Sequence, residues 1–210
     1  MGIIDTHWPG TGSHQPLIKA VMELYLPGFI LELGVGLYST PVFLNYKTKY
    51  MGVENDLTWV DHMKEKYNIN ILHHNLPDVT IWNQLKDLTE AQRTNICLYY
   101  KNLKVLNIHP RLLFVDQWAS CRVLSINTIG NKFDLIIYHD SESAGSDFNY
   151  YNLIELKGFK KYTLRSSNAW TTLLVKNDKG FDLLNEKILS YIADYKLSNN
   201  ENYMELENNS

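Results

Sequence analysis

The sequence has few features of a secreted, membrane or disulfide-stabilised protein. Its two cysteines among 210 residues, Cys97 and Cys121, have neither the spacing of a metal site nor the density of a disulfide framework. No apolar run reaches about 18 residues, and the N-terminal MGIIDTHWPG lacks the basic and apolar segments of a secretory signal. We therefore expect a cytoplasmic protein without membrane contact.

The sequence also has no excess of positive charge. It contains 20 Lys and Arg residues against 23 Asp and Glu residues, a net charge of -3. This balance disfavours nucleic acid as a partner, because binding to phosphates needs a basic surface. Hydrophobic residues make up 45% of the chain, enough for one core, so we expect a single domain over residues 1–210.

The most informative stretch is FILELGVGLYSTP, residues 29–41. Its apolar first half predicts a strand, and Gly34 and Gly36 predict a tight turn that allows close approach of the backbone to a ligand. Thr40 followed by Pro41 is typical of a helix N-cap and first helical position. The free N–H groups at such a helix start favour a carboxylate or phosphate.

Two glutamates indicate which ligand this turn binds. Glu32 would repel the pyrophosphate of a dinucleotide, whereas S-adenosylmethionine offers it an ammonium group and offers a carboxylate to the helix start near Ser39 and Thr40. Glu54 follows a second predicted strand, at the position expected to bind ribose hydroxyls. Ser39 also stands where the dinucleotide fingerprint has its third glycine.

ELGVGLYST and GVENDLTWV resemble motifs one and two of the class I S-adenosylmethionine-dependent methyltransferases. The resemblance implies an α/β, Rossmann-like, doubly wound fold. Its sheet would be seven-stranded and mostly parallel, with flanking helices and a C-terminal antiparallel pair, for which FKKYTLR and WTTLLVK are the candidates. It also implies that Asn75 lies near the adenine and that Asp116 contacts either the methionine amino group of the cofactor or the acceptor.

Three segments fall outside this minimal pattern. Residues 1–28 are expected to form a lid at residues 7–12 followed by a helix, and residues 79–109 a helical insertion. Both segments would shape the pocket for the methyl acceptor, because added loops carry specificity. The polar, acidic tail 197–210 predicts disorder.

Candidate catalytic residues follow two further apolar strands. RLLFVD ends in Asp116 and FDLIIYHD ends in His139 and Asp140, so these side chains are expected at one crevice with the cofactor. Any of the three could help to deprotonate a hydroxyl acceptor. Strand alternation predicts that only one of His139 and Asp140 faces the crevice. The other histidines, including His73 and His74, are interpreted as surface or loop residues.

Asp116 and Asp140 also resemble the metal ligands of small-molecule O-methyltransferases that hold a divalent cation such as magnesium. The match is partial. Ser141 stands where that group has asparagine, and Ala119 stands where it has a catalytic lysine.

These observations predict O-methylation of a hydroxyl on a small molecule or sugar. Two other readings remain open: a non-catalytic subunit that binds the cofactor, and an NAD(P)-dependent oxidoreductase, which Glu32 and the missing third glycine disfavour. The sequence predicts neither the acceptor nor the oligomeric state.

Overall fold

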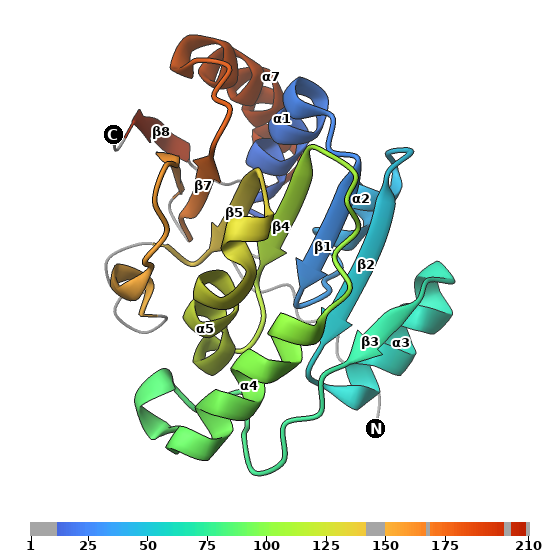
Figure 1. Ribbon diagram of the computed structural model, residues 1–210. Coiled ribbons are helices and arrows are strands. Elements are labelled where there is room, and N and C mark those ends of the chain that lie inside the picture. The colour runs from blue at the N-terminus through green and yellow to red at the C-terminus, as the bar shows by residue number, and fades with distance from the viewer. Residues whose placement is uncertain (1–11, 142–149, 167–168, 200–202, 209–210) are drawn as a thin grey trace.

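One mixed sheet runs through the computed structural model, which describes residues 12–141, 150–166, 169–199 and 203–208 (Figure 1). Its strands are β1 (Phe29–Leu33), β2 (Lys49–Glu54), β3 (Ile71–His73), β4 (Arg111–Val115), β5 (Leu135–His139), β6 (Lys160–Ser166), β7 (Thr171–Val175) and β8 (Tyr203–Asn208). Their order is β3-β2-β1-β4-β5-β7-β6-β8. Strands β1 to β5 are parallel to one another. β2 and β3 lie on one side of β1, whereas β4 and β5 lie on its other side, so the strand order reverses between β1 and β4, which is the reversal point of the sheet.

Helices cover both faces of this sheet (Figure 1). The helices are α1 (Gln15–Tyr25), α2 (Thr40–Leu44), α3 (Leu57–Tyr67), α4 (Glu90–Asn102), α5 (Ala119–Ile129) and α7 (Phe181–Asn199), with short 3-10 turns η1 (Leu85–Asp87), η2 (Gly130–Lys132) and η3 (Tyr151–Leu153). α1, α2 and α7 pack in one core cluster, whereas α4 and α5 pack in another on the opposite face. α3 packs beside β2 and β3 in a third, smaller cluster. Every residue of β1 is buried, as its apolar run predicts for a central parallel strand.

The predicted Rossmann-like class is confirmed, with one difference in strand number. β6 pairs with β7 in antiparallel orientation, as predicted. The sheet has eight strands rather than seven, because β8 pairs with β6 in the tail that was expected to be disordered. That expectation is wrong: Leu206 is buried in the core and Glu207 forms an ion pair with Arg165. Composition alone does not reveal such long-range pairing.

The segment predicted as an insertion contains η1 and α4, which lie in the connection from β3 to β4. Ile96 and Tyr100 of α4 have no exposed surface and belong to the core around α5. The segment is therefore integral to the fold, and its role at an acceptor pocket stays a prediction. The predicted lid at residues 7–12 lies almost entirely outside the described residues.

Candidate functional site

The glycine turn joins β1 to α2 at the reversal point of the sheet. Gly34 has a φ of 88°, and a Cβ there would lie 2.4 Å from the carbonyl carbon and oxygen of Asp116. Only glycine therefore allows the turn after β1 to lie so close to the chain that follows β4. The Gly36 N–H donates to Thr40 Oγ1 at 3.1 Å, which ties the turn to the start of α2.

Glu32 lies beneath this turn and is fully buried. Ser39 Oγ and Tyr50 OH donate to its carboxylate at 2.5 Å each, and Thr40 Oγ1 donates at 2.9 Å. Burial raises the pKa of Glu32 to about 7, although these hydroxyls lower it in part. The sequence predicted Thr40 as the N-cap of α2. In the structure no side chain caps this helix, and Thr40 hydrogen-bonds to Glu32 instead. The predicted contact of Glu32 with a cofactor ammonium stays a prediction.

Glu54 ends β2 and lies against the same glycine turn. Its carboxylate accepts hydrogen bonds from the N–H groups of Asn55 at 2.7 Å and Asp56 at 3.0 Å, and the Gly34 N–H donates to the carbonyl oxygen of the preceding Val53 at 2.9 Å. Burial raises the pKa of Glu54 to about 7, against the lowering effect of the two bonds to its carboxylate. The carboxylate is therefore held beside residues 34–36, and its predicted contact with ribose hydroxyls stays a prediction.

Arg122 of α5 joins Asp116 and Asp140, which follow β4 and β5. Its Nη2 donates to Asp116 Oδ1 at 3.0 Å, and its Nη1 donates to Asp140 Oδ2 at 2.8 Å. The Nε donates to the Gln117 carbonyl oxygen at 2.6 Å. The guanidinium thus fixes the chain after both strand ends while balancing two carboxylates.

His139 lies beside both Asp116 and Asp140, and the prediction that only one of His139 and Asp140 faces the crevice stays a prediction. Asp140 lies past the end of β5 with a φ of 54°, where strand alternation no longer applies. His139 Nδ1 lies 3.3 Å from Asp140 Oδ1 and 3.6 Å from Asp116 Oδ2, and His139 Nε2 hydrogen-bonds to Ser13 Oγ at 2.8 Å.

The protonation of this cluster follows from its charges. Burial lowers the pKa of His139, but Asp140 and Asp116 outweigh burial and raise that pKa to about 9. Burial raises the pKa of Asp140, but His139 and Arg122 outweigh it and lower that pKa to about 2. At neutral pH this arrangement pairs an imidazolium with two carboxylates, so His139 is not a free base in this conformation.

Solved structures with a similar fold include two methyltransferase-related proteins. A methyltransferase-like protein from Silicibacter pomeroyi is 17% identical with a TM-score of 0.51, over 87% of this chain and 94% of that chain. An O-methyltransferase from Bacillus cereus, in complex with SAH, is 12% identical with a TM-score of 0.53, over 80% of this chain and 82% of that chain. The chain has the fold of the class I methyltransferases. No protein-family model and no curated protein matches its sequence.

Within this methyltransferase fold, the predicted magnesium ligands Asp116 and Asp140 do not fit a metal between them. The Arg122 guanidinium already bridges the two carboxylates from one side, and His139 Nδ1 contacts both from another. A positively charged side chain therefore takes the place that a divalent cation would need. We correct the predicted ligand pair accordingly and assign no step to magnesium.

Two histidines predicted to be surface or loop residues are buried. His74, directly after β3, is 3% exposed, stacks on Tyr99 with ring centroids 3.6 Å apart and hydrogen-bonds to Tyr100 OH at 3.2 Å. His14, directly before α1, is also 3% exposed and packs against His139 and Phe114. Asn75 is exposed after β3, and its predicted place near an adenine stays a prediction.

The predictions missed Arg122 entirely. It lies six residues after Asp116, within the apolar helix sequence CRVLSI. An arginine in such a sequence must be paired when buried, which is the signal that could have indicated it.

Among the described residues, no helix is both long and apolar enough to span a membrane.

Proposed function

We propose that this protein binds S-adenosylmethionine and transfers its methyl group to a hydroxyl of a small molecule or sugar. The observation that carries the proposal is the position of Glu54, held by the N–H groups of Asn55 and Asp56 beside the glycine turn at the reversal point of the sheet. The cofactor residues in this proposal are Glu32, Gly34, Gly36, Ser39, Thr40, Glu54, Asn75 and Asp116.

The hydroxyl acceptor is inferred from the cluster after β4 and β5. The Asp140 side chain is 36% exposed and the Asp116 side chain is 27% exposed, so both carboxylates can reach a ligand. A carboxylate whose pKa lies near 2 is a weak general base, and we expect Asp140 mainly to orient the acceptor hydroxyl by accepting its hydrogen bond. His139 and Arg122 keep that carboxylate charged and in place.

Calorimetric titration with S-adenosylmethionine and S-adenosylhomocysteine tests the cofactor. We expect both to bind, and Glu54→Gln to weaken binding by about tenfold or more, because it replaces a charged acceptor by an amide. Glu65→Gln, which changes an exposed glutamate on α3, is the matched control and should bind like the wild type. Failure of the wild type to bind either compound would overturn the proposal. Thermal stabilisation by NAD or NADP instead would support an oxidoreductase.

A methyl-transfer assay over sugars, phenols and amines tests the acceptor. We expect turnover on hydroxyl acceptors, reduced at least about tenfold in kcat by Asp140→Asn with unchanged S-adenosylhomocysteine affinity. Asp61→Asn, an exposed change on α3, controls for the loss of a surface charge. Turnover confined to nitrogen acceptors would overturn the hydroxyl assignment, and cofactor binding without any turnover would support a non-catalytic subunit.

A further inference from the structure

His14 is a buried histidine with no hydrogen-bond partner. It precedes α1 and is 3% exposed, and among the described residues neither its Nδ1 nor its Nε2 has a partner. Leaving a buried polar group unpaired destabilises the folded protein. Such a cost at a buried imidazole indicates a ligand that would use one of these nitrogens.

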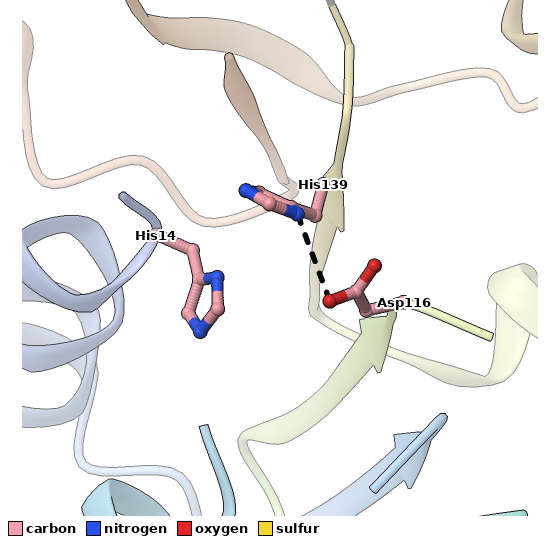
Figure 2. A group of neighbouring side chains, drawn as sticks. All are labelled: His14, Asp116 and His139. Atoms are coloured by element: carbon pink, nitrogen blue, oxygen red, sulfur yellow. Dashed lines mark ion pairs between the residues drawn. The ribbon is translucent and has the colours of Figure 1, made fainter. Parts of the chain in front are cut away.

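The His14 ring faces Asp116 and His139 (Figure 2). One possible ligand atom from each of the three residues lies within 4.8 Å of the others. His139 Nδ1 and Asp116 Oδ2 are 3.6 Å apart, close to the spacing of about 3.3 Å expected for two ligands on a tetrahedral ion with bonds of about 2 Å. His14 would need only a small side-chain movement to complete the set.

The surrounding hydrogen bonds orient these atoms for an ion. Ser13 Oγ is 2.8 Å from His139 Nε2, so Nδ1 is the nitrogen that faces Asp116. Arg122 donates to Asp116 Oδ1, so the other oxygen, Oδ2, points towards His139. Metal-binding histidines and carboxylates are typically held in this way by a partner on their second polar atom.

We propose that His14, Asp116 and His139 bind a divalent transition-metal ion, with Zn²⁺ as the representative case, and that the ion replaces the proton on His139 Nδ1, which is released to solvent. Two imidazoles and one carboxylate suit Zn²⁺, Co²⁺ or Ni²⁺, whereas Mg²⁺ prefers oxygen ligands. Three protein ligands leave a coordination position for water or an oxygen atom of a ligand. The site differs from the magnesium pair rejected above, since it uses His14 in place of Asp140, and it does not depend on the proposed methyl transfer.

Titration of the chelator-treated, dialysed full chain with Co²⁺ and Zn²⁺ tests this site. We expect one equivalent of Co²⁺ to give a visible absorption spectrum, Zn²⁺ to displace it, and Mg²⁺ to do neither. His14→Phe should weaken Zn²⁺ binding at least tenfold in calorimetry. His74→Phe is the matched control, because it removes another buried imidazole that lies outside the cluster, and it should bind Zn²⁺ like the wild type.

Thermal unfolding keeps the test decisive if a variant folds poorly. In chelator, His14→Phe should be at least as stable as the wild type, because it removes unpaired nitrogens while filling the space. Zn²⁺ should then raise the melting temperature of the wild type and not that of His14→Phe. Absence of Zn²⁺ and Co²⁺ binding by the wild type, or equal Zn²⁺ affinity in His14→Phe, would overturn the proposal. S-adenosylhomocysteine binding, measured on the same samples, separates this failure from failure of the proposed function.

Discussion

Gly34 lies directly against the main chain of Asp116, with its missing Cβ 2.4 Å from the Asp116 carbonyl carbon and oxygen. The turn after β1 and the chain after β4 therefore meet backbone to backbone at the reversal point of the sheet. Asp116 N also donates to the Leu33 carbonyl oxygen at 2.8 Å, one residue before this contact. The glycine thus sets the distance between the predicted cofactor turn and the acidic cluster.

Gly34→Ala should destabilise the protein by about 3 kcal/mol or more, since a methyl group would both strain a positive φ and collide with the Asp116 carbonyl group. Gly158→Ala is a matched control: its φ is also positive, at 77°, but a Cβ there meets nothing within 4 Å. It should cost only about 1 kcal/mol. Urea denaturation of both variants measures the difference, and equal losses would mean that the close approach is absent in solution.

Arg122→Met should destabilise the protein by about 3–5 kcal/mol, because Asp116 and Asp140 would lose their shared cation. Arg122→Lys should recover only part of this loss, since one ammonium cannot reproduce the fork that reaches both carboxylates. Urea denaturation provides the measurement. Lys160→Met is the control, because it removes a lysine whose side chain is 58% exposed from its ion pair with Asp178, and it should cost less than about 1 kcal/mol. A loss that small for Arg122→Met would contradict the bridging role.

The parts of the site that the sequence predicts are those carried by neighbouring residues. The glycine turn, Glu54 and the two strand-end aspartates each follow an apolar strand, and the parallel arrangement then brings them to one edge of the sheet. Asp56, directly before α3, caps that helix in a similarly local way, with Trp59 N donating to Asp56 Oδ1 at 3.1 Å. Local patterns suffice for these features.

The remaining parts depend on contacts between distant residues. Arg122 and His14 reach the cluster from α5 and from the start of α1, and no local spacing connects them with residues 139 and 140. The interactions of Glu32 were also missed, because they require the hydroxyl of Tyr50 from the neighbouring strand. Burial and charge pairing in three dimensions decide these roles.

Leu206→Ala should destabilise the protein by about 2 kcal/mol, because Leu206 carries β8 into the core. Asn208→Ala changes an exposed residue of the same strand and should stay within about 0.5 kcal/mol of the wild type. Chemical denaturation distinguishes the two variants. If both behaved like the wild type, the tail would not dock onto β6 in solution, and the sheet would have the seven strands predicted from the sequence.

Glu32→Gln should remove a specific pH dependence of stability. The pKa of Glu32 is raised from 4.5 to about 7 in the folded protein by burial, so its protonated form is favoured by folding. Its contribution to stability is fully present below pH 4.5 and is lost as the pH rises through about 7. Between pH 4.5 and pH 8, the free energy of unfolding of the wild type should therefore fall by about 3 kcal/mol relative to that of Glu32→Gln.

Urea denaturation of the wild type and Glu32→Gln between pH 4.5 and pH 8 measures the difference between their free energies of unfolding. The contributions of Glu54 and other groups cancel in this difference. Glu65→Gln, at an exposed position, is the matched control for the loss of one carboxyl group. A difference between wild type and Glu32→Gln that does not change with pH would mean that Glu32 ionises at its ordinary pKa. The three hydroxyl donors would then stabilise the charged carboxylate more strongly than burial opposes it, and Glu32 would be an anion beneath the glycine turn at every pH at which the protein works.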